Sequence, residues 1–339
     1  MRSKVLLLGK IEHANESWTS LSSYARLVKP QARSRAEFIE ECGSGALDGV
    51  LVVYRTFESV ELTGVFDEEL VNLLPQSVRF ICHNGAGYDQ INIRACTQRG
   101  IEVSNAPHVV NDSTADTAMF LMLGALRRFS VPMTTLREGT WRGSALPALG
   151  HDPEGKTLGI LGMGGIGRNL KRKAEAFGIR VIYHNRTKLS KPLAGGADFV
   201  SFQDLLSVSD IISINLPLNT NTRHMISTRE FEKMKDGVIL VNTARGAIID
   251  EAALVRALDT GKVASVGLDV YEEEPKVHPR LIANPNVILL PHMGTWSSET
   301  QKAMEERTIS NVWNALERAD YKGLRPCKSL SRKAALATY

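Results

Sequence analysis

Short apolar stretches alternate with longer amphipathic stretches along most of the chain. In the N-terminal third, the apolar stretches occupy residues 4–9, 49–54, 78–83 and 101–104, and helix-like segments separate them. Strands that alternate with helices form parallel sheets covered by helices on both faces. The pattern therefore predicts a doubly wound α/β unit in this part of the chain.

A second series of apolar stretches follows after a break. Strands are predicted at 156–162, 180–183, 211–215, 238–242, 265–270 and 287–290. Residues 297–318 form an amphipathic pattern that places Met304, Ile309, Val312, Trp313 and Leu316 on one helix face. No strand of the second series is left to pair with this helix, so it is expected to return to the first unit. The predicted domains are residues 1–106 with 297–339, and residues 107–296.

Residues 117–126 form a helix that is apolar on nearly every side, after an N-cap pattern at Ser113-Thr114-Ala115-Asp116. A helix without a polar face needs burial all round, either in a core or against another subunit. We therefore predict that this helix lies in or beside the two-fold interface of a homodimer.

The composition adds mainly exclusions. The chain has 339 residues, 43% of them hydrophobic, and a net charge of +4, which gives no reason to expect nucleic acid. No stretch is long and apolar enough for a membrane span, and the apolar run after Lys4 is too short for a signal peptide. The four scattered cysteines (Cys42, Cys82, Cys96 and Cys327) indicate reduced thiols and a cytoplasmic location. No metal is expected, and the basic segment 328–339 is typical of a solvated terminus.

A glycine-rich stretch stands between the strand at 156–162 and the next helix. Gly162, Gly164 and Gly167 have the G-x-G-x-x-G spacing, which is informative in this strand–turn–helix context. The first glycine permits a tight turn, the second lets a pyrophosphate approach the backbone, and the third lets helix and strand pack closely. The N–H groups of Gly165 and Ile166 would point at the anion. An ordinary glycine-rich turn is the alternative, but the context favours a dinucleotide site.

Three ionisable residues follow predicted strands of the second unit. Arg245, Glu274 and His292 would lie at the carboxyl ends of parallel strands, where ligands of open α/β sheets bind. Singly, they could be a surface cation, a solvated acid and a loop histidine. Together they suit carbonyl reduction: protonated His292 gives a proton to the oxygen, and Glu274 orients the ring and favours its charged form. Arg245 can clamp a carboxylate bidentately and polarise the carbonyl.

With these residues in place, the chain resembles the D-2-hydroxyacid dehydrogenase family over nearly its whole length. The resemblance rests on five blocks in order: His83-Asn84-Gly85-Ala86-Gly87-Tyr88-Asp89, Gly162–Gly167, Asn242-Thr243-Ala244-Arg245-Gly246, Gly267–Pro275 and Pro291-His292-Met293-Gly294. It implies two doubly wound α/β domains, a flavodoxin-like substrate domain and a Rossmann dinucleotide-binding domain.

The resemblance also assigns roles to residues. It implies Arg245, Glu274 and His292 as catalytic residues, and backbone N–H groups of Ala86 and Gly87 as ligands of the substrate carboxylate. Asp269 is implied near the nicotinamide amide. Beyond the glycine motif, it extends the cofactor site to Leu216, Pro217, Thr243, Ala244, Asp269, His292 and Gly294.

The turn after the second strand of the dinucleotide unit bears on the choice of cofactor. An NAD site carries Asp or Glu there, on the ribose hydroxyls, whereas this chain has Asn185, Arg186 and Thr187. No carboxylate would repel a 2′-phosphate, and Arg186 and Thr187 can bind one. A solvated polar turn is the alternative; the pattern favours NADP(H).

Within the family, the chain is most similar to the fungal-type glyoxylate/hydroxypyruvate (2-ketoacid) reductases. That similarity implies hydride transfer from NADPH to a small 2-keto acid, giving the D-2-hydroxy acid. Arg55, after a strand of the first unit, could contact a second anionic group or lie on the surface. Two alternatives remain: an NAD-linked D-2-hydroxyacid dehydrogenase of phosphoglycerate or mandelate type, and a nucleotide-sensing corepressor on the same fold.

Overall fold

The computed structural model describes residues 2–142 and 148–321. The chain divides into two compact units, Met1–Val110 with Ser297–Tyr339 (unit 1) and Asn111–Trp296 (unit 2). Cys42, Cys82 and Cys96 are buried free thiols, whereas Cys327 and the basic segment 328–339 lie outside the described residues. Among the described residues, no helix combines the length and the apolarity that a membrane span requires.

Unit 1 contains a parallel five-stranded sheet, with the strand order β2-β1-β3-β4-β5 over the described residues. The strands are β1 (Lys4–Leu8), β2 (Arg26–Val28), β3 (Val50–Thr56), β4 (Phe80–Asn84) and β5 (Glu102–Ser104). This is the flavodoxin-like order, which confirms the doubly wound prediction. The short edge strand β2 was not predicted, because its three residues begin with an exposed arginine and have no continuous apolar pattern.

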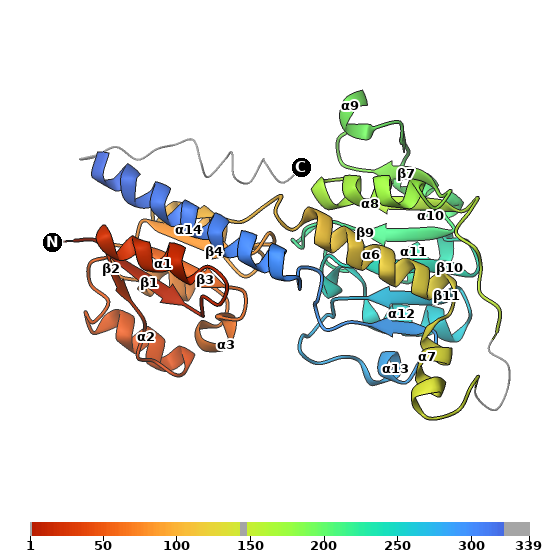
Figure 1. Ribbon diagram of the computed structural model, residues 1–339, viewed down its shortest axis with the longest axis horizontal. Helices are drawn as coiled ribbons and strands as arrows, with labels where there is room; N and C mark the ends of the chain where they lie inside the picture. The colour runs from red at the N-terminus through yellow and green to blue at the C-terminus, as the bar shows by residue number, and fades with distance from the viewer. Residues whose placement is uncertain (1, 143–147, 322–339) are drawn as a thin grey trace. The chain divides into compact units, whose positions relative to one another are not determined.

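Helices cover both faces of this sheet (Figure 1). They are α1 (Asn15–Ser20), the 3-10 helix η1 (Leu21–Ser23), α2 (Arg35–Gly43), α3 (Val60–Thr63), α4 (Glu68–Leu73), α5 (Ile93–Gln98) and α14 (Ser298–Tyr321). The C-terminal helix α14 packs against β3, β4 and α1, so the chain returns to its first sheet as predicted. Its predicted apolar face is buried, with Ile309, Val312 and Leu316 in the core.

Unit 2 contains a parallel seven-stranded sheet, with the order β12-β11-β10-β9-β6-β7-β8 over the described residues. The strands are β6 (Thr157–Leu161), β7 (Arg180–His184), β8 (Asp198–Phe199), β9 (Ile211–Ile214), β10 (Val238–Asn242), β11 (Val263–Leu268) and β12 (Val287–Leu289). Counted from β6, this is the Rossmann order with one further strand, and the order reverses between β6 and β9. The two-residue strand β8 was not predicted.

Helices also cover both faces of the second sheet (Figure 1). They are α6 (Asn111–Leu126), α7 (Ser130–Arg137), α8 (Gly165–Glu175), α9 (Lys191–Ala194), α10 (Phe202–Val208), α11 (Thr228–Lys233), the 3-10 helix η2 (Gly246–Ile248), α12 (Glu251–Asp259) and α13 (Pro279–Ile282). The apolar helix α6 packs against α8, β10 and β11, which buries nine of its residues within unit 2. Its apolar character is therefore largely explained without a second subunit, although Phe120 remains 49% exposed.

Candidate active site

The glycine loop joins β6 to α8, and each of its three glycines meets a different constraint. Gly162 has a φ of 95°, and a Cβ there would lie 2.8 Å from the carbonyl oxygen of Asn215, at the end of β9. At Gly167 a Cβ would lie 2.8 Å from the Gly162 oxygen, so helix and strand pack closely. A Cβ on Gly164 would meet no atom within 4 Å. The protein itself thus requires the first and third glycines, whereas the second faces open space.

This arrangement fits a dinucleotide. Gly164 is the N-cap of α8, an eleven-residue helix, and it offers no side chain to cap the first turn. The N–H groups of Gly165 and Ile166 therefore start a helix whose dipole favours an anion. Open space beside Gly164 and donors at the helix start are the features that a pyrophosphate needs.

The turn after β7 is tied to the glycine loop. The side-chain oxygen of Asn185 accepts a hydrogen bond of 2.7 Å from the Met163 N–H. Arg186, Thr187 and Lys188 follow, and all three are exposed. Sequence reasoning identified this turn by the missing acid but did not foresee the Asn185 contact, which joins residues 22 positions apart. Asn185 thus ties the turn after β7 to the glycine loop.

The remaining residues that the family resemblance assigned to the cofactor follow strands of the same sheet. Leu216 and Pro217 come after β9, Thr243 and Ala244 after β10, Asp269 after β11, and Gly294 after β12. Because parallel strands end at one edge, these residues share the edge that carries the glycine loop. Within residues 2–142 and 148–321, no cluster of His, Cys, Asp and Glu is arranged to hold a metal ion.

Glu274 and His292 form a hydrogen-bonded pair. His292 Nδ1 lies 2.8 Å from Glu274 Oε2, and both side chains are about 30% exposed, at 32% and 27%. The other carboxylate oxygen accepts the Tyr271 N–H at 3.0 Å. A carboxylate at Nδ1 fixes the tautomer with the proton on that nitrogen and leaves proton exchange with a ligand to Nε2.

The electrostatic surroundings keep Glu274 ionised. Burial alone would raise the pKa of Glu274, but the hydrogen bond and charge of His292 oppose it. The Tyr271 N–H and the charge of Arg245 act in the same direction, and together these partners lower the pKa of Glu274 below its usual value. A carboxylate therefore faces the imidazole throughout the neutral range.

Asp269 builds the turn on which His292 sits. Its side chain is 1% exposed, and its oxygens accept the N–H groups of Met293 at 2.5 Å and Gly294 at 2.8 Å. Its carbonyl oxygen also accepts the His292 N–H at 2.8 Å, and His292 has a positive φ of 58°. Burial raises the pKa of Asp269 above its usual value despite these bonds. Asp269 thus acts on His292 through the backbone.

The loop that carries Arg245 is held by Asn242 and Gly246. The Asn242 side chain donates to the Arg245 carbonyl at 2.9 Å and accepts the Ala244 N–H at 3.0 Å. At Gly246, a Cβ would lie 1.8 Å from the carbonyl carbon of Tyr271, so only glycine fits. Since Tyr271 also binds Glu274, this contact sets the Arg245 loop against the Glu274 loop. The structure thus brings Glu274 and His292 into contact and places Arg245 within electrostatic reach of Glu274.

In unit 1, the turn after β4 presents backbone donors. The carbonyl groups of Gly85, Ala86 and Gly87 accept hydrogen bonds, at 3.0 Å from the Ala106 N–H, 2.7 Å from Asn105 and 2.8 Å from His83 Nε2. The N–H groups of Ala86 and Gly87 make no hydrogen bond within the described chain. Both residues are half-buried. The turn thus has its acceptors occupied and two adjacent donors available.

Arg55, at the end of β3, is fully buried. Its Nε donates to Ser59 at 3.2 Å, and its Nη2 donates to Gln90 at 2.7 Å. The sequence offered two alternatives, a ligand contact or a surface arginine, and did not anticipate an internal one. A buried partner 35 residues away leaves no trace in a local sequence pattern.

Comparisons with known proteins agree with this architecture. Residues 119–294 match the model of the D-isomer specific 2-hydroxyacid dehydrogenase, NAD binding domain. The chain is 54% identical over 313 residues to 4-methyl-2-oxopentanoate reductase A of Aspergillus oryzae, which covers 92% of this chain and 94% of that protein. A glyoxylate reductase from Paecilomyes thermophila superposes with a TM-score of 0.91 at 55% identity, covering 94% of this chain and 96% of that one.

A more distant structure carries a cofactor. An NADPH-dependent glyoxylate/hydroxypyruvate reductase from Sinorhizobium meliloti, in complex with NADP and malonate, has a TM-score of 0.81 at 30% identity, over 92% of this chain and 93% of that one. The fold and the candidate site of the present chain are those of a dinucleotide-binding oxidoreductase. The chain belongs to the D-isomer specific 2-hydroxyacid dehydrogenase family.

Proposed function

We propose that the protein is an NADPH-dependent reductase of small 2-keto acids, of the glyoxylate/hydroxypyruvate type, that forms the D-2-hydroxy acid. The observation that carries this proposal is the His292–Glu274 pair, 2.8 Å apart, at the sheet edge that also holds the glycine loop. An imidazole that a carboxylate orients at a dinucleotide site suits the protonation of a carbonyl oxygen. The reductase names of the relatives support the same direction of reaction.

In this proposal, each residue of the candidate site has a defined role. Bound NADPH supplies a hydride to the carbonyl carbon. His292 delivers a proton from Nε2 to the carbonyl oxygen, and Glu274 holds Nδ1–H and stabilises the imidazolium. Arg245 binds the substrate carboxylate and polarises the carbonyl. The N–H groups of Ala86 and Gly87 take the carboxylate as well, because they are adjacent donors without an internal partner in the described chain.

The preference for NADPH rests on the turn at 185–187. Arg186 and Thr187 are exposed beside the glycine loop, and the turn carries no acid to repel a 2′-phosphate. The NADP complex of the Sinorhizobium relative supports this choice. Replacing Arg186→Asp should lower kcat/KM for NADPH strongly while sparing NADH. Lys191→Asp, on exposed α9, makes the same charge change outside the turn. It should leave the ratio of kcat/KM for NADPH to kcat/KM for NADH unchanged.

The substrate is tested by NADPH oxidation with a series of 2-keto acids, from glyoxylate and hydroxypyruvate through 4-methyl-2-oxopentanoate to phenylglyoxylate. The proposal expects the highest kcat/KM among the small members. Absence of turnover with the whole series would refute it, and a strong preference for phenylglyoxylate would favour the mandelate-type alternative. An unchanged cofactor ratio in Arg186→Asp would refute only the assignment of the 2′-phosphate.

The proposal includes a cytoplasmic homodimer in which α6 lies in or beside the two-fold interface. Support comes from apolar side chains that stay exposed on α6, α7 and the segment between them: Phe120, Phe129, Met133 and Leu136. Apolar surface of this kind is typical of subunit contacts. Sedimentation at micromolar concentration should give a dimer, and a monomer at that concentration would count against the interface.

A further inference from the structure

Arg55 combines complete burial with incomplete pairing. Its Nη1 makes no hydrogen bond within the described chain, and its other nitrogens bind only neutral groups, the Ser59 hydroxyl and the Gln90 amide. The guanidinium lies over the ring of Phe66, 5.1 Å from the centroid. Burial lowers the pKa of Arg55 to about 10, while the charges of Asp89 and Glu58 oppose the shift. At neutral pH, Arg55 is therefore a buried cation without a bonded carboxylate.

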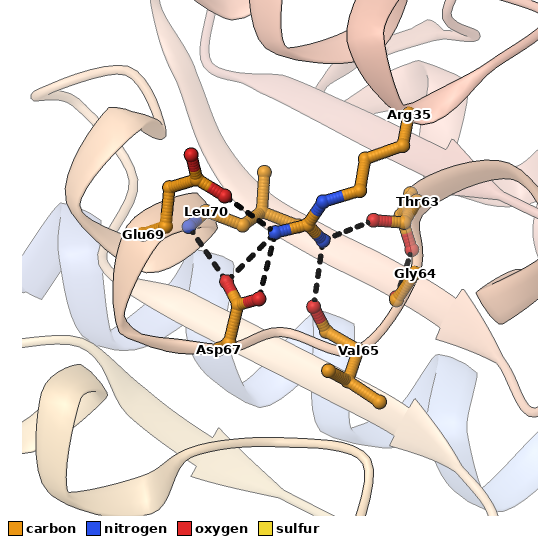
Figure 2. A network of polar contacts seen from close by, with 7 residues as sticks. All are labelled: Arg35, Thr63, Gly64, Val65, Asp67, Glu69 and Leu70. Atoms are coloured by element: carbon orange, nitrogen blue, oxygen red, sulfur yellow. Dashed lines mark hydrogen bonds and ion pairs between the residues drawn. The ribbon is translucent and has the colours of Figure 1, made fainter.

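Arg35, in the same unit, shows the more usual arrangement, in which an arginine is paired with carboxylates. Its guanidinium binds Asp67 and Glu69, at 2.7 and 3.1 Å, and the carbonyl groups of Thr63 and Val65 (Figure 2). Hydrogen bonding to Asp67 raises the pKa of Arg35, because the bound carboxylate favours the charged form. A buried charge without such a partner costs stability, so its retention at Arg55 calls for another benefit.

The contacts of Arg55 lead to the turn that presents Ala86 and Gly87. Gln90 accepts from Arg55 through its side chain, and its carbonyl oxygen accepts the Phe66 N–H at 2.8 Å. Phe66 in turn carries the guanidinium on its ring, so Arg55, Gln90 and Phe66 form a closed set of contacts. The Asn92 N–H donates to the Phe66 carbonyl at 2.8 Å, which fixes the segment on the other side. Gln90, three residues after Gly87, is thereby held through both its side chain and its backbone carbonyl.

Arg55 also lies in register with the strand that leads into the turn. On neighbouring strands, Arg55 pairs with His83, whose Nε2 holds the Gly87 carbonyl at 2.8 Å. The turn is thus fixed by His83 on one side and by Gln90 on the other. A buried positive charge acts over several ångströms because little solvent screens it. This charge acts on the 85–90 segment, where it faces the carboxylate of Asp89.

We propose that Arg55 is a positioning residue of the reduction: it fixes the 85–90 turn through Gln90 and gives that turn the positive potential that selects carboxylate substrates. This inference rests on the proposed function, since it assumes that the turn binds the substrate carboxylate. Arg55 acts without touching the substrate. This differs from direct contact with a second anionic group, which would require the guanidinium to be accessible.

Three variants separate the two parts of this role. Arg55→Met removes the charge and the Gln90 bond, Arg55→Lys keeps the charge, and Gln90→Leu removes the bond but leaves the charge. Arg55→Met should raise KM for the 2-keto acid, and Ki for the substrate isostere oxamate, by about tenfold, the usual effect on a charged hydrogen bond. kcat and KM for NADPH should change much less. Arg55→Lys should recover part of the loss, and Gln90→Leu should show a smaller rise in KM.

Arg99→Met is the matched control, because the hydrogen bonds of the Arg99 side chain among the described residues go to the backbone carbonyls of Val71, Leu74 and Pro75. It should lower the thermal midpoint without moving KM or the oxamate Ki. The inference fails if Arg55→Met leaves both constants unchanged, or if Arg99→Met raises them equally. Should Arg55→Met not fold, an unchanged KM in Gln90→Leu would overturn the positioning step. Wild-type turnover and oxamate inhibition are measured first; their absence would refute the proposed function, and this inference with it.

Discussion

The carboxyl ends of the two sheets present different chemistry. In unit 2, the loops after β10, β11 and β12 carry ionisable side chains, Arg245, Glu274 and His292, at least partly accessible to solvent. In unit 1, the loop after β4 offers two backbone N–H groups, and the nearby arginine is buried beneath the surface. Both edges lie at the carboxyl ends of parallel strands, where open α/β sheets bind their ligands.

The difference follows from what each edge has to do in the proposed reaction. Proton transfer requires a group that changes its charge, so unit 2 needs side chains with adjustable protonation. Recognition of a carboxylate requires only well-placed donors, which a backbone turn supplies without side-chain entropy. Side-chain substitutions should therefore damage unit 2 through kcat, whereas unit 1 should be sensitive mainly to changes that move its backbone.

The largest effect is expected for His292→Ala. Loss of a positioned acid should lower kcat for reduction by about 10²–10⁴, the usual contribution of such a group. NADPH binding, measured by fluorescence titration, should persist, because the proposed pyrophosphate site is the backbone at Gly164–Gly167 and does not include the imidazole. His224→Ala is the matched control: His224 forms a second His–carboxylate pair with Glu272, at 2.5 Å, in the same unit. Near-normal kcat in His292→Ala, or an equal loss in His224→Ala, would contradict the role of His292.

A backbone change should have the next largest effect. At Gly85, a Cβ would lie 2.6 Å from His83 Nε2, the atom that holds the Gly87 carbonyl. Gly85→Ala should therefore displace the turn and raise KM for the keto acid by about 10- to 100-fold, the equivalent of one or two charged hydrogen bonds, with a smaller effect on kcat. At Gly43 a Cβ meets nothing within 4 Å, so Gly43→Ala serves as control. A loss confined to kcat in Gly85→Ala would show that the turn does not bind substrate.

The same contrast explains how much could be predicted from sequence. The parallel sheets were predictable because buried parallel strands are continuous apolar runs, and the short edge strands β2 and β8 were missed because they lack such runs. The pairing of Glu274 with His292 could be anticipated from their places after strands. The Asn185–Met163 and Arg55–Gln90 contacts could not, because each depends on how loops far apart in sequence pack together.

The smallest expected effect concerns Glu274→Gln, which keeps the shape of the side chain and removes its charge. The carboxylate holds the ring at Nδ1 and its charge favours the protonated acid that reduction needs, so its loss should move the alkaline fall of kcat/KM to lower pH. Glu272→Gln, the partner of His224, removes a charge from the equivalent pair and should leave the profile in place. The measurement is kcat/KM for reduction between pH 5 and 9 (about two units either side of neutrality).

The pKa of Glu274 also determines how the stability of the fold depends on pH in acid. Because its folded-state pKa lies below the usual value, the ionised carboxylate stabilises the fold at any pH above the ordinary carboxyl range. That stabilisation is lost only as the pH falls through the lowered pKa. The thermal midpoint of the wild-type protein should therefore exceed that of Glu274→Gln by a constant amount near neutral pH, and this difference should shrink in strong acid. Because Glu274 is about a quarter exposed, this difference should be small. A pH profile that Glu274→Gln leaves unmoved would mean that the pair orients His292 without setting its charge, and the two sheet edges would then differ less than their residues suggest.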